Sequence, residues 1–533
     1  ACNSQTASPF GCLNNFYFRI LSNFLGSLHS LLVSFAMIFC FTACGKEKTE
    51  KVEMSGSGKD SNTVVVATSA EPTSLDPQFG EDTTTQRVVM QISDTLIGVD
   101  KDMNYVPKLA ESWEVSKDGK TYTFHLREGV KAHNGEILTS EDVAYTVERG
   151  KASTLVAKAF AAIESVECPD DTTVIMHLAY ASPVQLGYLS SPSTGIVNKK
   201  ACEEMGDDAF GRAPVAYGPY EVVSWDSGDK ITLKAFADYW GGEPSVKNAV
   251  FKVYTDSNTA AIALQNGQVD VLLDVSTADV ATLEANDKVT VYNGDSLIAF
   301  HLHLNCERTP FNNEKVRQAL NYAIDTQAII DAVFDGVGAV KMDSFIPKMS
   351  MSADMGSNPY GYDLDKAKAL LAEAGYADGF ECNILVTSGQ QEKMAQVIQG
   401  YLQPLGITVN INVYEWSTLL SIVETGDYDM TILRIVAMIP DPDLSLYTRF
   451  ESSQVYNFSK YYDKDLDKML EEARFCPDEA KRTEMYLNIN QYLWDVIPTV
   501  PLCFTTVINA ANAELNGYHT DPRGFVNVCE LSW

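Results

Sequence analysis

Two histidines, His301 and His303, are spaced so that they could share a metal ion. They alternate along a predicted strand, and alternate strand residues point to the same face of a sheet. A zinc site needs three or four ligands, and we find no third ligand near them in sequence. We therefore interpret both as ordinary strand histidines and predict no metal site.

Motifs of enzyme chemistry are missing from the sequence. It has no GxSxG nucleophile elbow, no HExxH metal-binding helix, no GxGxxG after a strand and no paired set of cysteines and histidines. A secreted α/β hydrolase would need a nucleophile or an acid–base set that we cannot find. We predict that the protein is not an enzyme and uses no cofactor.

The strongest local signals describe a hairpin followed by a helix. Asp118-Gly119 is a turn signal, because both residues tolerate positive φ, and residues 121–127 alternate like a half-buried strand. The run Thr139-Ser140-Glu141-Asp142 has the pattern of a capping box. A helix is expected over 143–149, with Gly150 ending it.

Strand and helix patterns extend over the rest of the chain. Strands are predicted at 63–67, 221–225, 229–235, 249–254 and 269–275, with a helix from Asp256 or Ser257 through Gln265 that Gly267 ends. This order predicts a βαβ unit of a mainly parallel sheet. Residues 301–499 resemble an α/β domain of their own, with helices and the strands 408–413 and 428–435, and the tail 500–533 returns to short apolar runs.

Composition places the chain among large soluble proteins. Its 533 residues are 45% hydrophobic, enough for two or three domains. Aspartate and glutamate outnumber lysine and arginine by 71 to 40, and the net charge of −31 argues against nucleic acid or an anionic membrane surface as the main partner. The seven cysteines beyond Cys44 are scattered and lack a CxxC pair, so we expect buried thiols with at most one or two bridges.

An apolar run at 28–41 is too short to span a bilayer comfortably. It ends in Phe41-Thr42-Ala43-Cys44 before Gly45, which resembles a lipoprotein signal peptide that leaves Cys44 as an acylated first residue. We predict a signal peptide over 1–43, then the lipidated cysteine and a flexible tether over 44–61, spanning roughly 20–25 Å. The alternative is an uncleaved membrane anchor.

The identities and order of residues 109–150 resemble those of the family 5 extracellular solute-binding proteins, which are peptide, nickel and oligosaccharide receptors of ABC importers. Two further segments, Glu71-Pro72-Thr73-Ser74-Leu75-Asp76-Pro77 and Asp238-Tyr239-Trp240-Gly241-Gly242, match the family too. The resemblance covers about residues 62–533. It implies an α/β, two-lobed periplasmic-binding-protein type II fold with an extra domain, so three structural domains around a central cleft. Domain I would comprise 62–94, 190–300 and 500–533, domain II 95–189, and domain III 301–499.

The resemblance also implies where ligand binds. Asp441-Pro442 matches a family Asp-Pro pair, and in peptide receptors an aspartate three residues earlier holds the ligand's amine; here that residue is Met438. A buried ammonium needs a carboxylate, so the amine would find Asp441 or Asp443, or the solute has no amine there. Arg434 could contribute a cation to the site, or it could be an exposed charge on its strand. Met438 could contact the ligand, or it could only pack at the side of the cleft.

Two other residues complete the candidate site. Trp416 falls where the family borders its cleft and could stack on ligand, unless it is a core tryptophan. Ser74 belongs to the matched opening segment. The candidate ligand-binding residues are thus Ser74, Trp416, Arg434, Met438, Asp441 and Asp443.

The function implied is a lipid-anchored receptor that captures a peptide or peptide-like solute and delivers it to an ABC permease. It would work as a monomer on the outer face of the cytoplasmic membrane, in the periplasm if the cell has an outer membrane. Alternatives within the family are a nickel-chelate or an oligosaccharide receptor, and a peptide-pheromone receptor would share the fold. The alternative of another class is the secreted hydrolase.

Overall fold

A computed structural model of the chain describes residues 62–351, 353–437 and 439–533. The predicted signal peptide, the tether with Cys44, and Met438 therefore lie outside the described residues. No helix among the described residues has both the length and the apolar character needed to cross a membrane.

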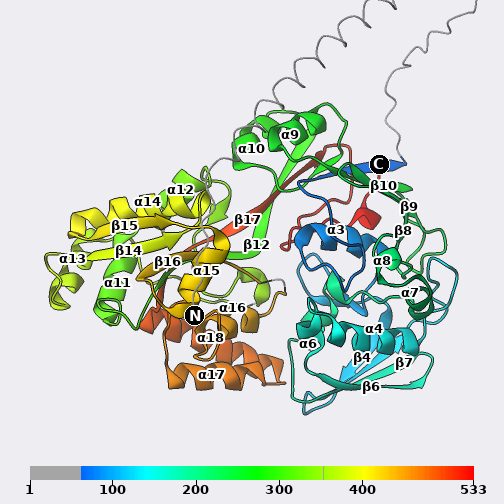
Figure 1. The fold of residues 1–533 in the computed structure, drawn as a ribbon, viewed down its shortest axis with the longest axis horizontal. Coiled ribbons are helices and arrows are strands. Elements are labelled where there is room, and N and C mark those ends of the chain that lie inside the picture. The colour runs from blue at the N-terminus through cyan, green and yellow to red at the C-terminus, as the bar shows by residue number, and fades with distance from the viewer. Residues whose placement is uncertain (1–61, 352, 438) are drawn as a thin grey trace, which may run out of the picture. The chain divides into compact units, whose positions relative to one another are not determined.

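A large mixed sheet runs through the described residues (Figure 1). It has 11 strands over those residues, and β13 (Ala339–Val340) pairs with β17 beside the main path. The order along the path is β15 (Thr408–Val413), β14 (Glu381–Val386), β16 (Met430–Val436), β12 (Val289–Leu304), β17 (Thr499–Asn512), β11 (Val271–Leu272), β1 (Thr63–Thr68), β10 (Asn248–Val253), β9 (Lys230–Ala235) and β8 (Tyr220–Asp226).

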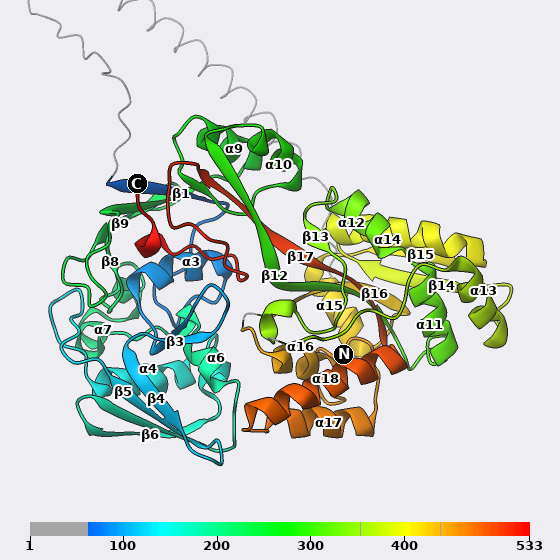
Figure 2. The same ribbon diagram turned by 180° about the vertical axis from the view of Figure 1, so that it is seen from behind.

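Two long antiparallel strands join the halves of this sheet. β12 pairs with β17 along most of its length, and its second half also pairs with β16. At the other end, β17 pairs with β11. Both views show β12 and β17 side by side as the crossing between the β14–β15 half and the β1–β10 half (Figures 1 and 2). The register shifts between Asp295 and Ala299, so the ladder is irregular near the middle of the crossing.

The prediction of a mainly parallel sheet is wrong. β1 pairs in parallel with β10 and β11, and β14 with β15 and β16, so the predicted βαβ unit is present. The pairs made by β8, β9, β12 and β17 are antiparallel. The first part of the predicted tail, up to Asn512, belongs to one 14-residue strand, β17, and strands buried on both faces carry no alternating pattern.

Helices cover the sheet in groups. The β14–β16 half buries one face against α11–α14 in an apolar core, and a second core joins α16, α17 and α18. The helices are α3 (Thr83–Ile92), α4 (Ser140–Ala152), α5 (Ala157–Phe160), α6 (Gln185–Leu189), α7 (Lys199–Met205), α8 (Asp207–Phe210), α9 (Ser257–Gln265), α10 (Thr277–Glu284), α11 (Glu314–Ala323), α12 (Thr326–Val333), α13 (Leu364–Glu373), α14 (Gln390–Leu402), α15 (Trp416–Thr425), α16 (Pro442–Phe450), α17 (Lys464–Arg474) and α18 (Glu479–Val496), with short 3₁₀ turns η1 (Pro192–Thr194), η2 (Lys348–Ser350), η3 (Gln403–Leu405) and η4 (Val528–Glu530).

A separate four-stranded antiparallel sheet contains the predicted hairpin. Its order is β4 (Ala110–Val115), β5 (Thr121–Leu126), β7 (Thr173–Leu178) and β6 (Ile163–Asp170), and a further pair joins β2 (Ile97–Val99) to β3 (Tyr105–Pro107). Gly119 has a φ of 69°, as the turn between β4 and β5 requires. The predicted capping box is confirmed at the start of α4, where the Thr139 N–H donates to Asp142 at 3.0 Å.

Gly150 does not end the helix that follows this hairpin, contrary to prediction. α4 continues to Ala152, and Gly150 is buried in its last turn. A Cβ on Gly150 would meet the ring of Phe160. The glycine therefore provides room for an aromatic side chain, a role that its neighbours in sequence do not reveal.

Candidate functional site

A cavity of about 600 Å³ lies between two parts of the chain that are far apart in sequence. One wall comes from β3, β5 and α6, and the other from η2 and the starts of α16 and α18. In both views α6 lies on the side of its half that faces α16 and α18 (Figures 1 and 2). Its volume is typical of small-molecule sites. The lining residues are Asp102, Met103, Asn104, Tyr105, Val115, Gly119, Tyr122, Pro183, Leu186, Met349, Ser350, Met351, Pro440, Asp441, Pro442, Cys476, Pro477, Glu479, Arg482, Thr483 and Tyr486.

A buried ion pair forms the charged part of this cavity. Asp441 caps the N-terminus of α16 by accepting the Asp443 N–H at 2.8 Å, and its side chain is 8% exposed. Arg482 of α18 donates to both carboxylate oxygens of Asp441, at 3.0 and 2.8 Å. Burial pulls the pKa of Arg482 down, but the Asp441 carboxylate more than offsets this, and the net shift is upward. Arg482 is therefore charged at neutral pH.

Arg482 keeps spare hydrogen-bonding capacity. Besides Asp441, it donates to the Ala473 carbonyl at 3.3 Å and to the Tyr486 hydroxyl at 3.3 Å. A guanidinium has five N–H donors, so within the described residues one N–H on Nη1 stays open for a solute. The Asp441 carboxylate also has lone pairs beyond those facing the guanidinium. The pair can thus offer a solute a donor and acceptors side by side.

Asp443 lies behind this pair and is fully buried. Its Oδ1 accepts the Tyr486 hydroxyl at 3.3 Å, whereas its Oδ2 has no hydrogen-bond partner and lies 3.7 Å from Nε of Arg474. Burial raises the pKa of Asp443 to about 6, and Arg474 opposes the shift. Asp443 does not line the cavity, so its carboxylate supports Tyr486 from within.

The remaining wall is aromatic and rich in methionine. Tyr122 donates its hydroxyl to the Ser182 carbonyl at 3.0 Å, and burial raises its pKa to about 12. Burial also raises the pKa of Tyr105, so both phenols stay neutral. Met103, Met349 and Met351 contribute flexible, polarizable thioethers. Such a wall can adapt to apolar side chains of different shapes.

Two of the predicted residues, Asp441 and Asp443, come together here, and the other described ones lie elsewhere. Trp416 is the first residue of α15 and is 51% exposed, so it is not a core tryptophan. Arg434 is exposed near the end of β16 and has no ion-pair partner among the described residues. Neither lines the cavity, and their ligand roles stay predictions.

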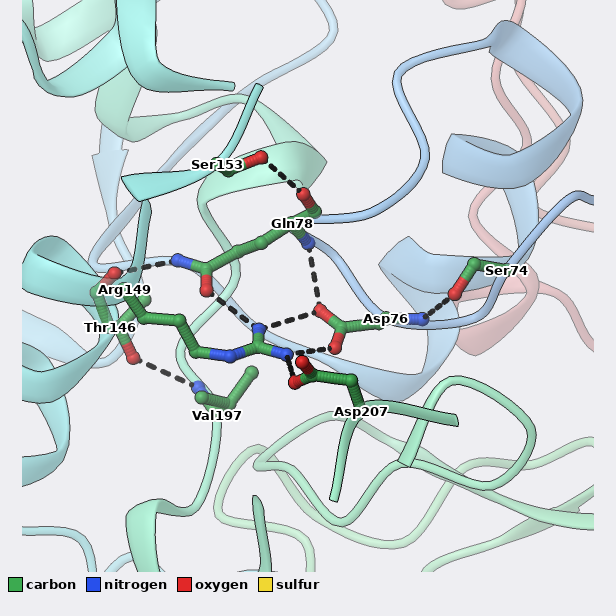
Figure 3. Close-up of polar contacts among 8 residues, drawn as sticks. All are labelled: Ser74, Asp76, Gln78, Thr146, Arg149, Ser153, Val197 and Asp207. Atoms are coloured by element: carbon green, nitrogen blue, oxygen red, sulfur yellow. Dashed lines mark hydrogen bonds and ion pairs between the residues drawn. The ribbon is translucent and has the colours of Figure 1, made fainter. Parts of the chain in front are cut away.

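Ser74 belongs to a polar network around Arg149 (Figure 3). Arg149 of α4 binds both carboxylate oxygens of Asp76, at 3.0 and 2.6 Å, and also contacts Gln78 and Asp207. Ser74 accepts the Asp76 N–H at 3.1 Å, which braces the same loop. This network fixes the segment 71–77 on α4, and Ser74 does not line the 600 Å³ cavity.

Sequence reasoning missed Arg482, Tyr105, Tyr122 and the methionines. Arg482 is 41 residues from Asp441 and sits in a helix of mixed polarity, so nothing local marks it. The only available signal was indirect, because a buried aspartate after a strand needs a cation somewhere. Among the described residues, no cluster of potential ligands could hold a metal ion, and all seven described cysteines are free.

A sheet crossed by two long strands, with a cavity between opposing parts, defines a two-lobed solute-binding protein of the periplasmic type II fold. The sequence model of the bacterial extracellular solute-binding proteins, family 5, matches residues 104–457. The chain belongs to this family, whose members are receptors for transport and not enzymes.

Relatives with known ligands include the dipeptide-binding protein of Escherichia coli (strain K12), 30% identical over 459 residues that cover 79% of this chain and 86% of that protein. Among solved structures, the ABC transporter-associated periplasmic binding protein DppA from Helicobacter pylori, in complex with the peptide STSA, has 29% identity and a TM-score of 0.71 over 88% of this chain and 98% of its own. NikZ from Campylobacter jejuni, in complex with Ni(L-His), has 25% identity and a TM-score of 0.72, and the match covers 89% of this chain and 100% of NikZ.

Proposed function

We propose that this protein is the receptor of an ABC importer and that it captures a peptide in the 600 Å³ cavity. The observation that carries the proposal is the buried Asp441–Arg482 pair beside an aromatic and methionine-rich wall. A peptide has a polar backbone and variable side chains, and this cavity offers fixed polar groups for the first and an adaptable surface for the second. The dipeptide-binding relative and the peptide-bound neighbour support the same class.

Asp441 is the acid that a peptide amine would reach. Asp443 is fully buried and does not line the cavity, whereas Asp441 does. Because Asp441 already binds Arg482, an ammonium would share the carboxylate with the guanidinium and would not neutralise an isolated charge. We expect this arrangement to hold an amine more weakly than a free carboxylate would.

We further propose that Cys44 carries the lipid, that the chain acts as a monomer, and that it delivers solute to the permease outside the cytoplasm. The family supports an extracytoplasmic location. The FTAC-Gly45 sequence after an apolar run supports lipidation.

The ligand class can be tested with a panel of chemically different solutes. Mass spectrometry of the co-purified solute should find a peptide, and a thermal-shift screen of peptides, Ni(L-His) and oligosaccharides should respond to peptides. Ligand at a hundred times its Kd should stabilise the fold by about 2.7 kcal/mol. A response to Ni(L-His) alone would place the chain with NikZ in ligand class, and cleavage of added peptides would instead favour the hydrolase.

The binding role of the cavity needs variants that keep the fold. Asp441→Asn retains an N-cap acceptor while removing the charge. If Asp441 holds the peptide amine, this change should weaken binding by about 2–5 kcal/mol, and Met438→Ala by less. N-acetylation of the peptide should weaken wild-type binding by a similar amount but should add little in Asp441→Asn. Asp465→Asn, at an exposed position on α17, is the control. Full loss on acetylation with unchanged Asp441→Asn affinity would mean that another acid holds the amine.

A further inference from the structure

A group of polar side chains with unpaired polar atoms is buried on β12 and on α16. Along β12, Phe300, Leu302 and Leu304 face the apolar core shared with α11–α14. His301 and His303 alternate with them and therefore face the other side of the sheet. Both are 1% exposed, and their rings lie 5.7 Å apart, centre to centre.

Arg449, in the last turns of α16, is the unusual member of this group. It is 3% exposed, and no carboxylate, carbonyl or hydroxyl among the described residues accepts a hydrogen bond from its guanidinium. Burial alone lowers its pKa, to about 9, so the side chain is still charged at neutral pH. A buried, unpaired charge is strongly unfavourable. By contrast, Arg317 of α11, which is also buried, donates to three backbone carbonyls.

The surrounding groups are also unsatisfied. Neither ring nitrogen of His301 has a partner, and His303 has only the Ser459 hydroxyl, at 3.2 Å from Nδ1. Burial and the charge of Arg449 lower the pKa of His303 to about 3, and burial, His303 and Arg449 lower that of His301. The two elements meet at Phe345, whose ring centre lies 6.0 Å from that of His301 and 5.7 Å from that of Phe450, the residue after Arg449. Ser445, one helical turn before Arg449 and on the same helix face, is fully buried with an unpaired hydroxyl.

These groups together offer donors and lack an anionic acceptor. A guanidinium has only donors, and each neutral imidazole and the hydroxyl can add one. The chain has 71 acidic residues, yet none forms an ion pair with Arg449 among the described residues. Water could fill hydrogen bonds but would leave the charge uncompensated. An anion supplied from solution would satisfy both requirements.

We infer that Arg449, with His301, His303 and Ser445, forms a buried binding site for a small anion, either a halide or the carboxylate group of a small organic acid. None of the four lines the 600 Å³ cavity, so this inference does not depend on the proposed peptide function.

The first test measures the unfolding temperature of the wild type in sodium gluconate, with gluconate replaced stepwise by chloride, bromide, nitrate or acetate at constant ionic strength. The unfolding temperature should rise and saturate with at least one small anion. A response limited to the inorganic ions assigns a halide-like ligand, and a response to acetate assigns a carboxylate. Arg449→Met should abolish the dependence. Lys468→Met removes a positive charge from an exposed position outside every candidate site and should keep the dependence.

The sign of the Arg449→Met effect separates the two interpretations. With an anion bound, Arg449→Met is less stable than the wild type at saturating anion. If the arginine is unpaired, an apolar replacement is more stable in every salt, and this result would overturn the proposal. A crystal of the wild type grown in bromide gives an answer even if the variant does not fold. An anomalous peak within hydrogen-bonding distance of Arg449 supports the site, and a map that is empty at that position in crystals grown in bromide and in crystals grown in acetate refutes it.

Discussion

The Asp441–Arg482 pair allows a quantitative test of how the candidate site is held. Its side chains are 8% and 12% exposed, and the contact is bidentate. Removing one member of a buried pair leaves the other charge uncompensated and costs about 3–5 kcal/mol. Arg482→Met should therefore lower the free energy of unfolding by about this amount. It also removes the Arg482–Tyr486 stacking, in which the guanidinium carbon lies 4.8 Å from the ring centre.

The double variant distinguishes an electrostatic effect from lost packing. Asp441→Asn keeps the cap of α16 and removes the charge that Arg482→Met would leave behind. Asp441→Asn with Arg482→Met should thus be more stable than Arg482→Met alone, with a coupling energy on the order of 2–3 kcal/mol. Urea unfolding of the four solute-free proteins at pH 7 measures it. Lys468→Met, in an exposed i,i+4 pair with Glu472, is the control and should have a much smaller effect.

A coupling energy below about 0.5 kcal/mol would refute this reasoning, because contacting buried charges must be coupled. A stabilised Arg482→Met would refute it as well, since it would mean that the Asp441 carboxylate is solvated without its partner. In either case the pair could not be a preorganised element of the cavity.

Other residues give four further predictions. Folding raises the pKa of Asp443 from 3.8 to about 6, so its charge lowers the free energy of unfolding by about 3 kcal/mol above pH 6, and this loss disappears as the pH falls to 3.8. Asp443→Asn should therefore raise the free energy of unfolding by up to that amount at pH 7–8 and by almost nothing at pH 4. An increase that is the same at both pH values would contradict the raised pKa. Gly150→Ala should destabilise by about 1–3 kcal/mol against the Phe160 ring, whereas Gly400→Ala, in open space inside α14, should stabilise by about 0.5–1 kcal/mol; thermal unfolding compares them. Saturating ligand should reduce the radius of gyration by small-angle scattering if the lobes close, and an unchanged value would count against a hinged receptor. Cys44→Ala should release the protein from the membrane fraction, and retention at the wild-type level would identify residues 28–41 as an anchor.

Local sequence determined the elements whose signals lie within a few residues. The Asp118-Gly119 turn, the capping box at Thr139 and the cap of α9, where Asp256 accepts the Thr259 N–H at 2.8 Å, are all as predicted. Each depends on backbone dihedral angles and on hydrogen bonds that span two or three residues, so the chain carries the full information locally. Matched family segments added the fold, which no local pattern could supply.

Tertiary structure alone decided the features that join distant residues. Gly150 lies inside α4 because Phe160 needs its space, and β17 is one long strand because β12 pairs with it across both halves of the sheet. Arg482 reaches Asp441 from 41 residues away, and the end of α16 with Arg449 meets Phe345, which also packs on His301, nearly 150 positions earlier in the chain. The sequence shows the order of charged residues and the periodicity of apolar ones. The burial of a residue and the partner of a charge depend instead on which surfaces meet when the chain folds. For that reason the sequence by itself predicted Asp441 and Asp443 as candidates, and only the folded chain showed which of them meets the cavity and what holds it there.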